Sequence, residues 1–261
     1  MRIRGLRAAV GALAVLAAMT ACSSDPEPTA SSPAPVTTPS DTASISASPA
    51  PSEDPNLFTS TVAYVKGSSV KVYDKPYGEV VMTLKAKDVL TVPDKTPLVL
   101  LAKTVQKDGI EVYLPVRPNG TTGWVEPRDV QLYATDYQLD VFIKDHELVL
   151  SKGGEELGRY PIGTGRDELP TPGGVYFIRE LLAPPNPKGA YGPYAYGLSG
   201  YSPVLDNFKG GDAVIGIHGT NDPSSIGKDV SHGCIRLSND AITELVETWQ
   251  LPLGTPVYIH D

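Results

Sequence analysis

Hydrophobic and polar residues alternate in short stretches through residues 58–134, which is the pattern of strands that bury one face. Lysine, glycine, proline and aspartate separate these stretches, as they do where a chain turns. The predicted strands are Thr61–Val65, Val70–Tyr73, Val80–Leu84, Leu98–Leu101, Glu111–Val116 and Thr122–Val125. Between the last two, Arg117–Gly120 ends in Asn-Gly, residues that accept the positive φ angles of tight hairpins. The pattern predicts a small β-barrel or β-sandwich.

A second block of alternating residues begins near Tyr137. Apolar residues recur at every second position over 139–143 and again over 148–150, on either side of a charged turn, so we expect a β-hairpin. Residues 212–218 alternate in the same way. His218 falls at the end of this strand, on the face where Gly216 leaves room, because alternate residues point to the same side.

One helix is predicted after Ser238 and Asn239, which are favourable N-cap types. Apolar residues then recur at helical spacing, namely Ala241, Ile242, Leu245, Val246 and Trp249. Pro252 and Gly254 end the helix, and Pro256–Ile259 is a last predicted strand. The expected fold class is therefore mainly β: a small β domain followed by a second β domain with one substantial helix.

The start of the chain has the features of an exported protein. Three arginines within the first seven residues precede an uncharged apolar run, Ala8–Met19, which has the shape of a signal peptide. This run would form a helix of roughly 18 Å, too short for a hydrocarbon core of about 30 Å. It closes on Met19–Cys22, which resembles the lipobox of bacterial lipoproteins. We expect lipidation of Cys22, and the alternative is ordinary secretory cleavage nearby.

Residues 23–56 are almost all Ser, Thr, Pro or Ala, which cannot fill a core, so a disordered linker is expected. The expected organisation is a signal peptide and lipobox over 1–22, the linker over 23–56, a first β domain over 57–135 and a second domain over 136–261. Net charge is +2 over 57–135 and −8 over 136–261. Neither half carries the concentrated positive charge that phosphate binding needs, so no nucleic-acid partner is expected.

Cys22 and Cys234 are the only two cysteines. With Cys22 at the processing site, Cys234 would be an unpaired exported thiol, which risks oxidation unless it has a task. An imidazole that removes the thiol proton raises the thiolate concentration, and both His218 and His232 precede Cys234. Gly233 lets the backbone bend so that amide N–H groups face the same point as the sulfur, as an oxyanion hole requires. A zinc site built from the two histidines and Cys234 is an alternative.

Two short stretches, 217–220 and 231–235, carry a resemblance to a known family. They read Ile-His-Gly-Thr and Ser-His-Gly-Cys-Ile, and together they resemble the active-site motif of the L,D-transpeptidase (YkuD-type) family. The resemblance extends over 137–260, because Pro170–Tyr176 is similar to the family's Thr-Pro-x-Gly turn before an aromatic strand. It implies an L,D-transpeptidase β-sandwich domain. Residues 57–135 are weakly similar to bacterial SH3-like wall modules, which implies a small SH3-like β-barrel.

The resemblance assigns catalytic roles by position. It implies that Cys234 is the nucleophile, that His218 is its general base, and that the Gly219 carbonyl orients the imidazole. His232 would shape the oxyanion hole with the N–H groups of Gly233 and Cys234, or else make only a structural hydrogen bond.

Substrate contacts are expected from the same motif and from a tyrosine-rich segment. Ser231 is one such contact, and Arg236, which stands where some family members carry Asn, could bind a stem-peptide carboxylate. The segment Lys188–Gly197 and the residues after it hold four tyrosines among glycines, which suits an aromatic cover over the donor. Tyr201 and Tyr196 are the expected contacts there.

The resemblance further implies that Cys234 attacks the third stem residue of a tetrapeptide donor, releases D-Ala and passes the acyl group to an amine. The product is a 3→3 crosslink, without metal or cofactor, and carbapenems would acylate the thiol. Expected partners are peptidoglycan stem peptides and, through the N-terminal lipid, the membrane, so the protein is expected outside the cytoplasm and facing the wall. A hydrolytic L,D-carboxypeptidase of the same fold and a non-catalytic wall-binding lipoprotein are the alternatives.

Overall fold

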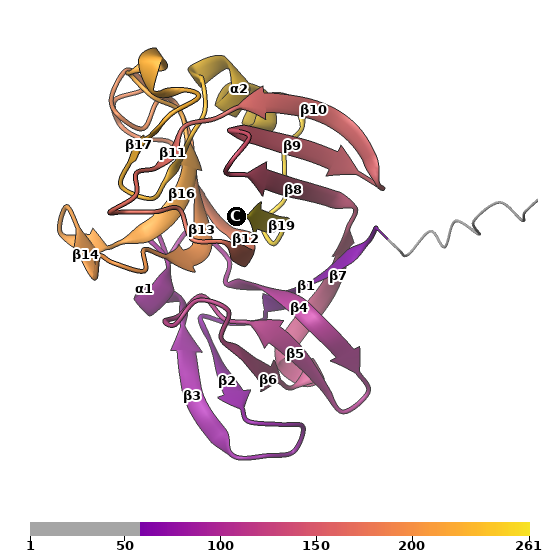
Figure 1. Cartoon of the computed structure of the whole chain (residues 1–261). Helices are drawn as coiled ribbons and strands as arrows, with labels where there is room; N and C mark the ends of the chain where they lie inside the picture. Colours follow the sequence, from indigo (N-terminus) through magenta and orange to yellow (C-terminus); the bar gives the residue numbers. More distant parts are fainter. Residues whose placement is uncertain (1–57) are drawn as a thin grey trace, which may run out of the picture. The chain divides into compact units, whose positions relative to one another are not determined.

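The structure, a computed structural model, describes residues 58–261. The predicted signal peptide, lipobox cysteine Cys22 and linker lie outside the described residues. The described chain forms two large β-sheets and is mainly β (Figure 1). No helix within 58–261 has the length and apolar character needed to cross a bilayer.

The first sheet is antiparallel, with seven strands in the order β3-β2-β6-β5-β4-β1-β7. Its strands are β1 (Ser60–Val65), β2 (Ser69–Tyr73), β3 (Val80–Lys85), β4 (Val99–Gln106), β5 (Gly109–Tyr113), β6 (Thr122–Val125) and β7 (Val130–Thr135). A short helix, α1 (Ala86–Val89), follows β3, and a 3-10 turn, η1 (Pro127–Asp129), precedes β7. The buried faces of these strands form a core that includes Val62, Leu100 and Ile110.

The second sheet is mixed, with eight strands in the order β10-β9-β8-β19-β12-β13-β16-β18. Its strands are β8 (Tyr137–Phe142), β9 (Glu147–Lys152), β10 (Glu155–Pro161), β12 (Gly174–Leu182), β13 (Ala195–Tyr201), β16 (Val214–His218), β18 (Ile235–Arg236) and β19 (Pro256–His260). β8 and β9 form the predicted hairpin. β19 lies between β8 and β12 and runs parallel to β8, so the last strand of the chain is central in the sheet.

Two small two-stranded sheets lie near the end of β16. β14 (Asn207–Phe208) pairs with β15 (Gly211–Asp212), and β11 (Thr164–Gly165) pairs with β17 (Asp229–Ser231). A 3-10 turn, η2 (Pro223–Ser225), precedes β17. β17 ends just before the loop that carries Cys234.

The predicted helix is present but changes its winding part-way. α2 (Asn239–Thr243) begins after Ser238, whose hydroxyl accepts the Ala241 N–H at 3.1 Å, as expected of an N-cap. A π-helical turn, η3 (Glu244–Thr248), follows, and the Trp249 N–H reaches the Glu244 carbonyl at 3.1 Å.

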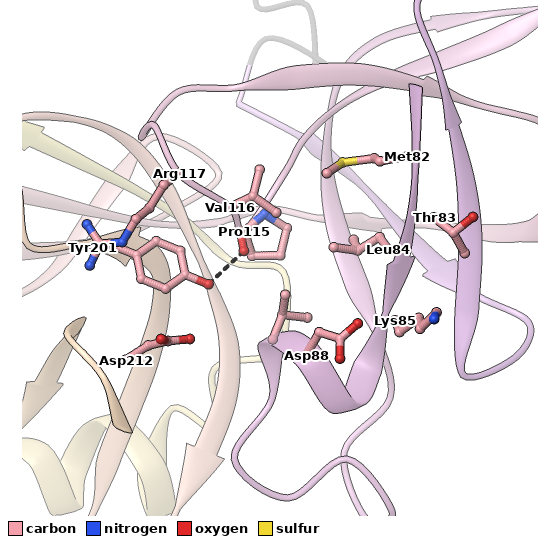
Figure 2. A pocket seen from close by; sticks show the side chains of 11 residues that line it. Met82, Thr83, Leu84, Lys85, Asp88, Pro115, Val116, Arg117, Tyr201 and Asp212 are labelled. Carbon is pink, nitrogen blue, oxygen red and sulfur yellow. Dashed lines mark hydrogen bonds between the residues drawn. The ribbon is translucent and has the colours of Figure 1, made fainter. Parts of the chain in front are cut away.

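The two sheets share packing and hydrogen bonds. Phe177 of β12 is fully buried in the core of the first sheet. Arg117 Nη1 donates to the Ser202 carbonyl at 2.6 Å, and Asn119 exchanges two hydrogen bonds with the backbone of Tyr201, at 2.8 and 2.9 Å. The turn predicted at Arg117–Gly120 therefore docks the first sheet onto β13. Beside this contact, β3, α1 and Tyr201 line an interface pocket of about 290 Å³ (Figure 2).

Candidate active site

His218 ends β16 and is held in one orientation. Its Nδ1 lies 2.6 Å from the Gly219 carbonyl, so Nδ1 carries the proton and Nε2 is left as the acceptor. The Tyr191 ring packs edge-on against the imidazole, with centroids 4.9 Å apart. Burial lowers the pKa of His218 to about 4, partly offset by the bond to Gly219 and reinforced by the charge of Arg236. The imidazole is therefore neutral at neutral pH and can accept a proton.

Cys234 lies in the loop between β17 and β18, and Ser231 shapes that loop. The Ser231 hydroxyl accepts the Gly233 N–H at 3.0 Å and donates to the Cys234 carbonyl at 2.6 Å. Gly233 has φ 110°, which glycine adopts without strain. Its carbonyl accepts the Thr171 hydroxyl at 3.0 Å, so the Thr-Pro turn recognised in the sequence supports the cysteine loop.

These contacts bear on two expectations. The Gly233 N–H is occupied by the Ser231 hydroxyl, so it does not face a reacting oxygen as an oxyanion donor would. The hydroxyl of Ser231, which is 1% exposed, is itself used in the loop and positions Cys234, while a substrate contact by Ser231 stays a prediction. The Ser-His-Gly-Cys motif places Ser231 and Gly233 two residues apart but does not show that the Ser231 hydroxyl bonds to the Gly233 N–H.

The Cys234 thiol is free and faces the start of β16. Its Sγ lies 3.8 Å from the Val214 carbonyl. Burial raises the pKa of the thiol, while the backbone of Gly216 and the charge of Arg236 partly lower it. The resting site therefore contains a protonated thiol and a neutral imidazole.

Cys234 and His218 together line a cavity of about 400 Å³, which we call the acidic cavity. Its walls come from β12, β13, β16 and the segment after β12. Thr91, which lies between α1 and β4, also lines it. Glu180 and Asp212 are its charged residues, and none of the described residues that line it is Lys or Arg. Gly216 and His218 of β16 both line it, as expected for residues on one face of that strand.

A second cavity of about 260 Å³, the basic cavity, also contains Cys234 and His218. Arg236 and Lys209 line it together with His232, and no Asp or Glu is among its described lining residues. The Nε of Arg236 is buried without a hydrogen-bond partner among the described residues. His232 is exposed, its ring lies 5.3 Å from that of Phe208, and partial desolvation together with Arg166 lowers its pKa.

The structure also corrects the predicted tyrosine cover. Tyr196 and Tyr201 belong to β13, a strand inside the sheet, and not to a loop. Tyr196 is 1% exposed and donates to the Leu245 carbonyl at 3.2 Å, although it is also among the residues that line the acidic cavity. Tyr201 lines the interface pocket, where its hydroxyl donates to the Pro115 carbonyl at 2.8 Å (Figure 2). Tyr191 is the tyrosine of this group that lines both cavities.

Several residues beside Cys234 were not singled out in the sequence. Phe208 and Lys209 come from the β14–β15 hairpin, and the Lys209 ammonium lies 5.4 Å from the centroid of Tyr191. The two glycines that follow Lys209 are a hairpin signal, but they lie outside the alternating stretches that predicted strands. Asn239 accepts the Thr220 N–H at 2.9 Å and so fixes the turn that begins at Gly219.

The zinc alternative was tested on the arrangement of side chains. Over residues 58–261, no group of three or more His, Cys, Asp or Glu side chains is placed so that it could hold a metal ion.

A family model described as the L,D-transpeptidase catalytic domain, YkuD, matches residues 136–259. The YkuD protein of Bacillus subtilis is 37% identical over 128 residues, which cover 49% of this chain and 68% of that protein. The chain belongs to the YkuD family of L,D-transpeptidases. The YkuD protein of Bacillus licheniformis is 37% identical over 123 residues, 47% of this chain and 65% of that protein.

Among solved structures, that of Bd1075 from Bdellovibrio bacteriovorus is similar to this L,D-transpeptidase family member. The two are 28% identical with a TM-score of 0.37, and the match covers 48% of this chain and 47% of the other. The YkuD match begins at residue 136, so the first sheet lies outside it. Family membership makes the chain an enzyme of the class that acts on peptides of the cell wall.

Proposed function

We propose that this chain is a cysteine-dependent L,D-transpeptidase that forms 3→3 crosslinks between peptidoglycan stems. The observation that carries the proposal is that Cys234 and His218 open into one cavity while the Gly219 carbonyl holds His218 Nδ1, which leaves Nε2 able to take the thiol proton. Cys234 attacks the carbonyl of the third residue of a tetrapeptide stem and releases D-Ala. An amine of a neighbouring stem then takes the acyl group.

The protonation states support proton transfer during attack rather than a resting ion pair. The pKa of the thiol is raised and that of the imidazole is lowered, so both groups are neutral before substrate binds. His218 accepts the proton as the C–S bond forms and returns it to the leaving amine of D-Ala. The Cys234 N–H is the backbone donor proposed for the developing oxyanion, because the Gly233 N–H is engaged by Ser231.

The basic cavity is proposed to receive carboxylates of the donor stem. Arg236 and Lys209 supply positive charge there, and the unpartnered Nε of Arg236 leaves hydrogen-bonding capacity for an anion. His232, at the mouth of this cavity, is placed to contact the same group. Tyr191 covers His218 and would limit the access of water to the acyl-enzyme.

The regions outside the family match are assigned from the sequence. Residues 57–135 are proposed to be an SH3-like wall module, and residues 136–261 the catalytic domain. Cys22 is proposed as the lipidation site of a membrane-anchored, extracytoplasmic protein, with residues 23–56 as the linker. Cys22→Ala would then yield unacylated protein in the medium, and acylated membrane-bound variant would contradict the anchor.

The function is tested with a defined tetrapeptide stem and mass spectrometry. Intact protein should gain the mass of the tripeptide acyl group on Cys234, and crosslinked dimer should form when an acceptor stem is added. Cys234→Ala should give no adduct, and His218→Ala should acylate slower by about two to four orders of magnitude. Free tripeptide as the only product, across different acceptors, would instead assign a carboxypeptidase; no adduct from stems or carbapenems would leave a wall-binding protein.

A further inference from the structure

A carboxylate stands in the wall of the acidic cavity. Glu180 lies on β12, is 1% exposed and faces Gly197 of the neighbouring strand β13. A Cβ at position 197 would stand 2.8 Å from the Glu180 Cγ and 3.0 Å from its Oε1. Glycine at 197 therefore leaves the space that this side chain fills, and the carboxylate is built into the site.

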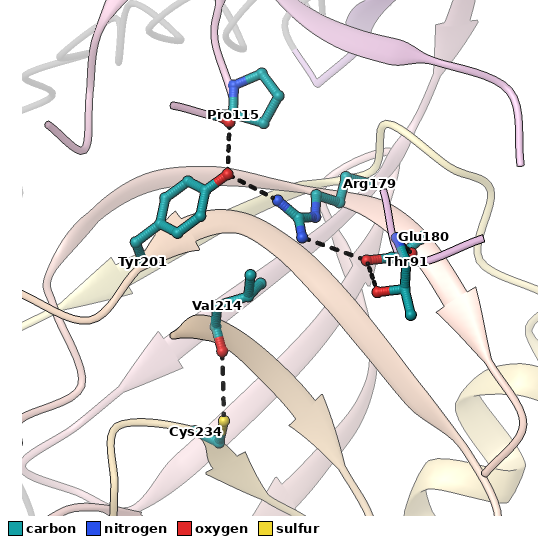
Figure 3. Close-up of polar contacts among 7 residues, drawn as sticks. All are labelled: Thr91, Pro115, Arg179, Glu180, Tyr201, Val214 and Cys234. Atoms are coloured by element: carbon teal, nitrogen blue, oxygen red, sulfur yellow. Dashed lines mark hydrogen bonds and ion pairs between the residues drawn. The ribbon is translucent and has the colours of Figure 1, made fainter. Parts of the chain in front are cut away.

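Three donors hold the carboxylate in place (Figure 3). The Thr91 N–H donates to Oε2 at 2.8 Å, and the Thr91 hydroxyl donates to Oε1 at 3.0 Å. Arg179 Nη2 forms a buried ion pair with Oε1 at 3.4 Å. Arg179 is buried and also donates to the Tyr201 hydroxyl at 3.1 Å. Because each of these groups donates, the set fits an ionised carboxylate, and Oε2 with its single partner keeps a lone pair for another donor.

Charge is divided across the nucleophile. The acidic cavity carries Glu180 and Asp212, whereas the basic cavity carries Arg236 and Lys209. Both cavities contain Cys234 and His218, so the two regions of opposite charge meet at the reacting atoms. A donor rich in carboxylates suits the basic side, which leaves the acidic side for a molecule that arrives as a cation.

We propose that Glu180, positioned by Thr91, selects the cationic amine acceptor and binds it on the acidic side of Cys234. This inference rests on the proposed function, in which an amine takes the acyl group. An alkyl amine has a pKa of about 10 and therefore arrives protonated, as a partner for a buried carboxylate. Thr91 belongs to the segment that follows α1, so residues outside the family match take part in acceptor recognition.

The transfer step balances without a further reactant. The bound ammonium gives one proton to water, and the neutral nitrogen attacks the thioester carbonyl. As the C–N bond forms and the C–S bond breaks, the second proton passes to His218 and from it to the Cys234 thiolate. The products are an amide and the free thiol, and Glu180 binds and orients the amine.

The test is a competition between two nucleophiles on the full chain. A tetrapeptide donor is supplied with Nα-acetyl-lysine, whose side chain is cationic, and with hydroxylamine, which is largely neutral near pH 7.5. Glu180→Gln should lower the ratio of lysine product to hydroxamate about tenfold, since one buried charge contact is lost. Thr91→Val should lower the ratio in the same direction, and Thr91→Ser, which keeps the hydroxyl, should restore it. Glu155→Gln, at an exposed carboxylate on β10, is the matched control.

The outcomes separate specificity from structure. An unchanged ratio in Glu180→Gln overturns the inference, and so does an equal fall of both products, because a purely structural role would slow every nucleophile alike. The mass of acylated intact protein is recorded first in each case. If the wild-type chain forms no acyl-enzyme at all, the proposed function itself is overturned; if it forms one and the ratio does not respond to Glu180, only the acceptor assignment is.

Discussion

Acidification should destabilise the folded protein through the burial of His218. Burial holds the pKa of this imidazole at about 4, against 6.5 for an exposed histidine. Between these values the unfolded chain binds a proton that the folded chain does not, so the free energy of unfolding falls as the pH falls. From pH 7.5 to pH 5 this single group lowers the free energy of unfolding by about 2 kcal/mol, a thirtyfold change in the folding equilibrium constant.

The measurement is urea unfolding, followed by tryptophan fluorescence, at about pH 7.5 and pH 5. Wild-type protein is compared with His218→Gln, because glutamine can still donate toward the Gly219 carbonyl but does not titrate. Contributions from carboxylates cancel in this comparison, and the wild type should lose about 2 kcal/mol more than the variant. Equal losses in the two proteins would refute the assignment of a buried, neutral imidazole. The same pKa predicts an acid limb of Cys234 acylation near pH 4 rather than 6.5.

Three further results are expected. Tyr201→Phe should lower the free energy of unfolding, measured in urea, by about 1–3 kcal/mol, because it leaves the buried Pro115 carbonyl unsatisfied. Slower acylation with unchanged stability would instead indicate that Tyr201 contacts substrate. Gly192→Ala should slow acylation in stopped-flow assays, because Gly192 has φ 63° and an added Cβ would lie 2.7 Å from the Gly219 Cα. Gly120 has φ 81° but no atom near an added Cβ, so Gly120→Ala should lower stability without slowing acylation. Tyr191→Ala should raise the ratio of free tripeptide to crosslinked dimer by mass spectrometry, and an unchanged ratio would remove its role as a cover.

Alternating apolar and polar residues predicted the strands that bury one face and expose the other. Some strands with another burial pattern were missed. The alternation of β2, β8 and β16 is visible because their burial alternates along most of each strand. β7 is buried only at its two ends, so its middle residues gave no alternation to detect. The tyrosines of β13 appeared as a loop because glycines separate them, yet both faces of that strand are covered.

In the candidate site, contacts between sequence neighbours could be predicted and contacts between distant residues could not. The contact between His218 and Gly219 joins neighbours in the chain, so a short motif was enough to predict it. The contact between Thr91, in the segment after α1, and Glu180 of β12 joins residues 89 positions apart and leaves no local pattern. The acidic wall of the cavity could therefore be found only from the folded arrangement.

The central position of β19 has a consequence for how the enzyme reaches its folded state. Val257 pairs with Leu139, more than a hundred residues earlier, and Tyr176 pairs with Val257 on the other side. Until residues 256–260 are available, β10-β9-β8 and β12-β13-β16-β18 are two separate fragments with unpaired edges. A chain synthesised from its N-terminus thus cannot close this sheet before the last strand has emerged, and closure through such distant pairing is expected to be slow.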